Sequence, residues 1–141
     1  MRLNRVVLDT TFSDKEEALE FISLQMEELG IVEKKEHFLE ALKERESLGA
    51  TGLTDGFAIP HGKDARIRDA AVVYVRNAGG IAWETLDDSL VTDMFALAIP
   101  EDGSNAHLDD LIAISTSLMD EEVCEKLRAA KNEDEVKNIF Q

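Results

Sequence analysis

The sequence is poor in cysteine and in basic residues, and each shortage narrows what the protein can be. One cysteine among 141 residues rules out a disulfide within the chain, which is typical of a reducing compartment. Fifteen Lys and Arg stand against 30 Asp and Glu, for a formal net charge of −15. Such a chain repels phosphate backbones and anionic lipid surfaces, so we expect no nucleic-acid binding and no membrane insertion. The same charge would steer a basic protein partner toward it.

Long apolar runs are missing too. No stretch approaches the roughly 20 residues of a membrane-spanning helix, and the N-terminal residues lack the apolar segment of a secretory signal. With two prolines there is no Pro-rich linker, and neither repeats nor low-complexity tracts occur. Hydrophobic residues still make up 44% of the chain, which suits a packed core. We therefore expect one soluble, cytoplasmic domain over residues 1–141.

Apolar runs of strand type alternate with stretches of helical periodicity. Strands are predicted at "RVVLD", "GFAIP", "AAVVYVRN" and "LVTDMFALAIP". Pro60 must end the second strand or place it at a sheet edge. The sequence "NAGG" is expected to close the third strand, and Pro100 the fourth.

Helices fill the gaps between these strands. Ser13 followed by Glu16 is a capping-box pattern that predicts the start of a helix ending near Gly30. Amphipathic stretches predict further helices at residues 33–48, after the loop "EDGSNAH", at 123–129 and at 136–140. One face of the second helix is expected to carry Phe38, Ala41, Leu42 and Leu48. The pattern predicts an α/β fold with a single mixed β-sheet and helices on both faces, in a strand order that the sequence leaves open.

The segment "GFAIPHGK" places a histidine at a stiff corner of the chain. Pro60 restricts its own backbone and that of Ile59, whereas Gly62 permits close backbone approach. His61 is thus expected at the end of a strand, on a rigid rim. An imidazole is a nucleophile near neutral pH without deep tuning of its pKa. A turn histidine without a chemical role is equally compatible with the segment by itself.

Arg45 and His107 are two further candidates. Arg45 shares the helix face of Phe38 and Leu42, where a guanidinium needs an anionic partner. His107 falls in the first turn of a helix with Ser104 or Asn105 as N-cap, and that helix end attracts anions. In isolation, a structural ion pair for Arg45 and an ordinary surface position for His107 are the simpler interpretations.

The other reactive side chains are assigned structural roles. His37 is expected on a solvated helix face, and Cys124 is expected to pack within a helix because neighbouring carboxylates disfavour its thiolate. A metal site built from His61 and His107 lacks any local ligand spacing. No metal or cofactor is therefore expected.

Taken together, these segments resemble a known family. The stretch "GFAIPHGK" is similar to the segment "GIAIPHGK" that carries the phosphorylated histidine in enzyme IIA components of the phosphotransferase system (PTS), fructose/mannitol class (EIIA type 2). The stretch "KERESLGATGL" resembles the family's RE…T-G-I segment. Residues 79–115 resemble its later stretch, which contains a Trp, a Pro and a His-Leu pair. Leu53, Thr54 and Asp55 depart from the usual Ile-Gly-Asn, and Asp55 adds a negative charge near the site.

The resemblance implies a mechanism. A phosphohistidine carrier protein would donate a phosphoryl group to His61, through Nε2, and a IIB component would receive it for sugar uptake. Arg45 would neutralise phosphoryl charge, and His107 would hydrogen-bond the phosphoryl group or the imidazole. Thr51 is a further candidate for a hydroxyl contact. No IIB or IIC segment is recognised, so those partners are expected on separate chains.

A second role remains open. The resemblance extends to a nitrogen-related branch of regulatory IIA proteins, which bind other proteins according to their phosphorylation state. Both roles use the same histidine, so the site residues do not separate them.

Overall fold

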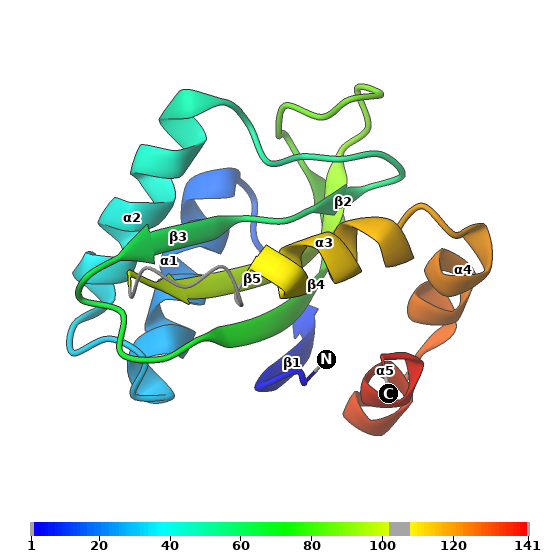
Figure 1. Ribbon diagram of the computed structural model, residues 1–141. Helices are drawn as coiled ribbons and strands as arrows, with labels where there is room; N and C mark the ends of the chain where they lie inside the picture. Colours follow the sequence, from blue (N-terminus) through cyan, green and yellow to red (C-terminus); the bar gives the residue numbers. More distant parts are fainter. Residues whose placement is uncertain (1, 102–107, 141) are drawn as a thin grey trace.

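The structure, a computed structural model, describes residues 2–101 and 108–140. Within those ranges the chain forms one strand, two helices, four strands and three helices, in that order (Figure 1). The elements are β1 (Arg5–Thr10), α1 (Lys15–Glu28), α2 (Lys35–Leu48), β2 (Phe57–Ala58), β3 (His61–Asp64), β4 (Ala71–Ile81), β5 (Val91–Pro100), α3 (Leu108–Ser117), α4 (Glu121–Ala129) and α5 (Glu133–Ile139).

The strands form one mixed sheet. Its order is β1-β4-β5-β2, and β3 continues in line with β2 along the same strand, β5. β1 is parallel to β4, β4 is antiparallel to β5, and β5 is parallel to β2 and β3. Helices α1 and α2 cover one face, and α3, α4 and α5 lie against the other (Figure 1). The predicted fold class is confirmed.

Alternation along the central strands builds a core on each face. Val73 and Val75 of β4 join the cluster beneath α1 and α2, whereas Val72 and Tyr74 join the cluster beneath α3, α4 and α5. Successive side chains of a strand point to opposite faces, so a strand covered on both sides must be apolar throughout. This is why "AVVYV" reads as a continuous apolar run.

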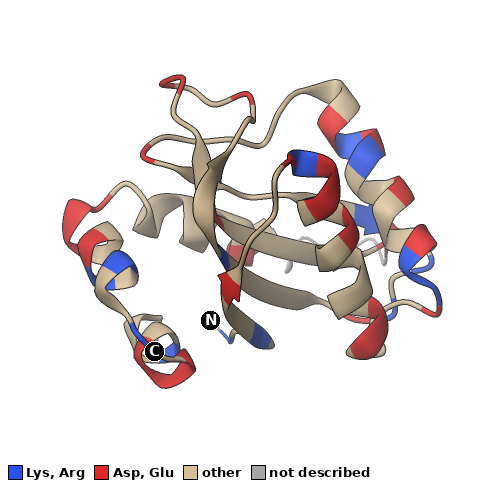
Figure 2. Ribbon diagram, turned by 180° about the vertical axis from the view of Figure 1, so that it is seen from behind, with Lys and Arg blue, Asp and Glu red and all other residues tan. Residues whose placement is uncertain are grey.

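Most charged residues lie on helices and loops (Figure 2), although β1 contains Arg5 and Asp9, and β3 contains Lys63 and Asp64. The long central strands β4 and β5 carry one charged residue each, Arg76 and Asp93. Within residues 2–101 and 108–140, no helix combines the length and apolarity needed to cross a lipid bilayer.

The first two helices differ in detail from the prediction. Helix α1 starts one residue late: Asp14, not Ser13, is the N-cap and accepts from the Glu17 amide at 2.9 Å, while Glu17 reaches back to the Ser13 amide. In α2, Phe38, Ala41 and Leu42 of the predicted face are buried, whereas Leu48 is 81% exposed. Leu48 follows Ala41 by seven residues, about two turns, so it points to the same side of the helix, but it is the last residue of α2 and lies on the surface.

Two strand predictions also need correction. The sequence "NAGG" does not close β4, since the strand runs on to Ile81 through a register shift that absorbs the glycines. His61 begins β3 and does not end the preceding strand. Pro60 separates β2 from β3 because it has no N–H to donate, and this interruption is tolerated at a sheet edge.

Close approach of β3 to α2 depends on Gly62. A Cβ at this position would lie 2.8 Å from the Cβ of Ala41 and 3.3 Å from the Ala41 carbonyl carbon. Only glycine therefore allows the first residues of β3 to pack directly on α2. The contact brings the end of α2 beside His61.

We expect Gly62→Ala to destabilise the fold by about 1–3 kcal/mol, because the added methyl overpacks the interface between β3 and α2. Thermal or denaturant unfolding measures the change. Gly79→Ala is the matched control: a Cβ there has no atom within 4 Å, so its effect should stay within about 0.5 kcal/mol. Equal stability of the two variants would contradict the steric argument.

Candidate functional site

His61 is held by a hydrogen bond to its own chain. Its Nδ1 lies 2.8 Å from the carbonyl oxygen of Ile59. A carbonyl can only accept, so Nδ1 carries the proton and donates it. Nε2 is then the free, nucleophilic nitrogen. The Ile59 carbonyl thus fixes the tautomer of the ring.

Arg45 selects the same tautomer from the other side of the ring. Its Nε donates to His61 Nε2 at 3.2 Å, and its Nη1 donates to the Gly49 carbonyl at 2.7 Å. A guanidinium can only donate, so this contact also requires an unprotonated Nε2. The structure thus brings together two residues that lie 16 positions apart in the sequence.

The surroundings keep the imidazole neutral. Partial burial is the largest cause that lowers the pKa of His61, and the positive charge of Arg45 lowers it further. The Ile59 carbonyl and the charge of Glu46 act in the opposite direction, but the net shift is downward. Near neutral pH the ring is therefore mostly in its nucleophilic form.

An apolar hollow opens beside the ring. It has a volume of about 300 Å³, and its lining is Ala41, Glu44, Arg45, Leu48, His61, Lys63, Ile99, Leu108 and Leu111. Leu48 and Leu108 are 81% and 43% exposed, and neighbouring Ile112 is 61% exposed. Exposed large apolar side chains around a polar centre are typical of a surface that meets another protein.

Thr51 turns its hydroxyl toward Glu46. The Thr51 side chain donates to Glu46 Oε1, its amide lies 3.3 Å from Glu46 Oε2, and the residue is buried. Glu46 was absent from the sequence-based candidates, although it directly follows Arg45. The signal was present in the pair "RE" of the resemblance.

Two candidates remain, His107 and Cys124. His107 lies outside the described residues, as do Ser104 and Asn105; Leu108, the first residue of α3, lines the hollow beside His61. Cys124 is buried and its thiol contacts the Leu118 carbonyl at 3.3 Å; burial raises its pKa. In the described ranges no three His, Cys, Asp or Glu side chains gather as a metal site would require.

Neutral Nε2, a facing guanidinium and an apolar rim define a site suited to transfer of an anionic group between proteins. The model of the family "Phosphoenolpyruvate-dependent sugar phosphotransferase system, EIIA 2" matches residues 1–141. The chain belongs to this family.

Similar proteins fall into two groups. The chain is 34% identical over 138 residues to the fructose-specific EIIA component of Haloferax volcanii, covering 98% of this chain and 90% of that protein. It is 37% identical over 128 residues to the nitrogen regulatory protein of Klebsiella oxytoca, covering 89% and 78%. The chain spans 20% of the longer EIIABC component of Escherichia coli specific for 2-O-alpha-mannosyl-D-glycerate, with 33% identity.

Solved structures show the same division. The nitrogen regulatory protein IIA-Ntr of Neisseria meningitidis superposes with a TM-score of 0.91 at 29% identity, covering 96% of this chain and 92% of that one. The mannitol IIA of Escherichia coli, in complex with phosphorylated IIB, superposes with a TM-score of 0.80 at 25% identity, covering 96% and 92%.

We expect the pKa of His61 to lie below the ordinary value of about 6.5 and to rise in Arg45→Met, where the opposing charge is gone. An NMR titration of the ring nitrogens measures both.

As the pH falls, the imidazole of His61 is protonated in the unfolded chain before it is protonated in the folded protein. The stability contributed by the neutral His61 is therefore lost as the pH falls below about 6.5. Arg66→Met removes an equal charge from an exposed ion pair and should leave the titration unchanged; a pKa above 6.5 in the wild type would contradict the argument.

Proposed function

We propose that residues 1–141 form one EIIA type-2 domain that carries a phosphoryl group on Nε2 of His61, between a phosphohistidine carrier protein and a IIB component in sugar uptake. One observation carries the proposal: Nδ1 is committed to the Ile59 carbonyl, which leaves Nε2 unprotonated and facing Arg45. A nucleophile beside a cation is what a phosphoryl group requires.

The chemistry balances without a cofactor. The lone pair of Nε2 attacks phosphorus in line, the bond from phosphorus to the donor nitrogen breaks, and that electron pair returns to the donor ring. The acceptor ring then carries positive charge, which spreads to Nδ1–H. Its bond to Ile59 becomes charge-assisted and stronger as the reaction proceeds. No proton needs to leave the site.

Arg45 changes partner during the transfer. In the free protein its Nε donates to Nε2, which is the position that the phosphoryl group takes. The guanidinium then turns to the equatorial oxygens, where its planar fork stabilises their charge. We assign His107 a hydrogen bond to the phosphoryl group or the imidazole.

Both partners are proteins that must reach the same histidine. The exposed leucines around His61 offer an apolar contact surface to each in turn, and the net charge of −15 would speed encounter with a basic donor. A related mannitol IIA has been solved in complex with phosphorylated IIB, and an equivalent complex is part of the proposal. The reduced single cysteine fits a cytoplasmic location.

A regulatory role is the second candidate. The similarity to nitrogen regulatory proteins, 37% in sequence and a TM-score of 0.91 in structure, favours it. In that role phosphorylated and unphosphorylated forms would bind different proteins, with the same chemistry at His61.

We expect the wild-type protein to be labelled by radioactive phosphoenolpyruvate together with the first PTS kinase and the carrier protein, and His61→Ala to lose the label. His37→Ala, which removes a histidine away from the hollow, should be labelled normally. Alkali-stable, acid-labile label identifies phosphohistidine. Label that persists in His61→Ala would overturn the site assignment.

The two roles are separated by offering purified phosphorylated protein to candidate IIB domains. Under the uptake proposal, the label should move to at least one IIB domain within the time of a single turnover. Transfer to none, together with capture of a protein by only one of the two phosphorylation states, would favour the regulatory role.

A further inference from the structure

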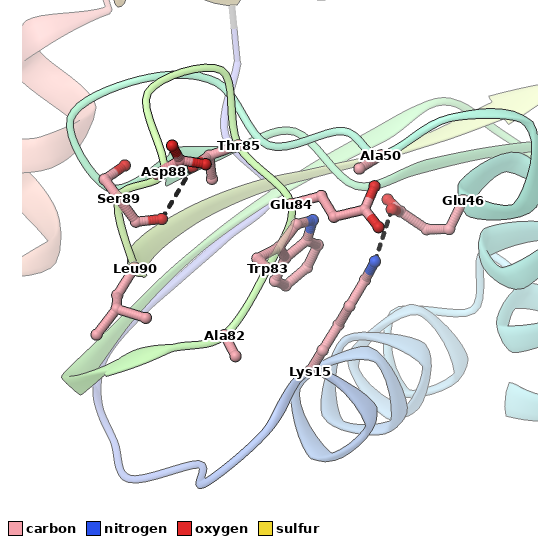
Figure 3. Close-up of a pocket in the computed structure, with 10 residues that line it drawn as sticks. All are labelled: Lys15, Glu46, Ala50, Ala82, Trp83, Glu84, Thr85, Asp88, Ser89 and Leu90. Atoms are coloured by element: carbon pink, nitrogen blue, oxygen red, sulfur yellow. Dashed lines mark hydrogen bonds and ion pairs between the residues drawn. The ribbon is translucent and has the colours of Figure 1, made fainter.

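Glu46 and Arg45 are neighbours on the last turns of α2, but they face different parts of the protein. Arg45 contacts His61, whereas Glu46 accepts from Lys15 of α1 at 2.8 Å (Figure 3). Consecutive helical residues differ by about 100° in direction, which explains the divergence. The side chain of Glu46 is only 8% exposed.

Lys15 is itself held in place. Its Nζ lies 4.7 Å from the centroid of the Trp83 ring, a cation–π contact, and Trp83 is buried. Figure 3 shows Lys15 extending past this ring to the Glu46 carboxylate. The pair lies in a hollow of about 760 Å³ that shares no described lining residue with the one beside His61.

A chain of hydrogen bonds leads from Glu46 to the nucleophile. Glu46 accepts from the hydroxyl and the amide of Thr51. The Thr51 carbonyl accepts from the Ile59 amide at 3.0 Å, and the Ile59 carbonyl accepts from Nδ1 of His61 at 2.8 Å. Thr51 and Ile59 each take part in two successive interactions of this chain, so the position of one residue constrains the position of the next.

Arg45 also holds the start of this loop, because its Nη1 donates to the Gly49 carbonyl. The loop between α2 and β2 is therefore fastened at Gly49 by Arg45 and at Thr51 by Glu46. A shift of Thr51 would therefore move Ile59, whose carbonyl accepts from His61.

We propose that Glu46, held by Lys15 and bonded to Thr51, is a positioning residue that sets the orientation and tautomer of His61 from outside the site. The inference rests on the proposed function and deepens it. Glu46 touches neither the imidazole nor the incoming phosphoryl group; it acts by placing the Ile59 carbonyl. Thr51 thereby acts through Glu46 and Ile59 instead of contacting the phosphoryl group.

The first test is Glu46→Gln, which keeps the shape of the side chain. The Glu46 carboxylate accepts three hydrogen bonds, whereas one of the two polar groups of a glutamine amide can only donate. The rate of phosphoryl acceptance at saturating donor should fall roughly tenfold, since misplacement by about 1 Å can cost up to about a hundredfold. The donor concentration for half-maximal rate should not change, because the docking surface is intact. Glu16→Gln is the matched control: it breaks an exposed ion pair to Lys43 that joins the same two helices and should transfer at the wild-type rate.

Thr51 supplies a second, independent pair of variants. Thr51→Val removes the hydroxyl at nearly constant volume and should reproduce the loss, whereas Thr51→Ser restores the hydroxyl and should recover most of the rate. If Glu46→Gln fails to fold, this pair decides the matter. Equal rates for valine and serine would overturn the proposal.

Ring-nitrogen NMR of His61 gives a readout that does not require phosphoryl transfer. Glu46→Gln and Thr51→Val should show a mixture of the two imidazole tautomers where the wild type shows one. Loss of the Glu46 charge should also lower the pKa of His61, since that charge raises it. A single unchanged tautomer in both variants would refute the positioning role. Absence of labelling in the wild type would instead refute the proposed function.

Discussion

The approach of β3 to α2 is the constraint on which the site depends. A methyl group at Gly62 would meet Ala41, so only glycine lets the strand seat against the helix. That contact sets the distance between the imidazole of His61 and the guanidinium of Arg45. The bond between Nε2 and Arg45 requires this distance, and the nearby Arg45 charge adds to the effect of burial in lowering the pKa of His61. The apolar strands beneath supply a rigid base for it, since both faces of the sheet are covered.

The site combines a rigid centre with an adaptable rim. The ring of His61 is fixed by a backbone carbonyl and by a residue on a helix, so Nε2 is already unprotonated and in place for the transfer proposed above. Around it lie exposed leucines that present apolar area without a fixed hydrogen-bond pattern. A carrier must bind two partners in succession and release each, and apolar contact of modest area suits transient complexes. This division suits an uptake carrier and a regulatory protein equally well.

Much of the molecule could be predicted from patterns along the chain. Alternating apolar runs and helical periodicities led to a mixed sheet covered on both faces, because burial dictates those periods. Errors arose where a local rule competed with tertiary contacts. The glycines of "NAGG" signalled a turn, but pairing with β5 carried β4 past them. Ser13 fitted a capping box, yet Asp14 can also cap a helix, and Asp14 is the N-cap of α1 in the structure.

The sequence alone identified candidate residues of the site. These are a histidine between proline and glycine and an arginine on a helix, which the family resemblance links. These follow from residue types and spacing, which one-dimensional patterns preserve. Only tertiary structure decided which atoms face one another. The contact of Arg45 with Nε2 joins residues 16 positions apart. The Ile59 carbonyl that accepts from Nδ1 and the Glu46 carboxylate that accepts from Thr51 are near their partners in the sequence, but residue types do not fix which atoms of these segments meet. Those distances come from the packing of β3 on α2 and of α2 on α1, which no local propensity encodes.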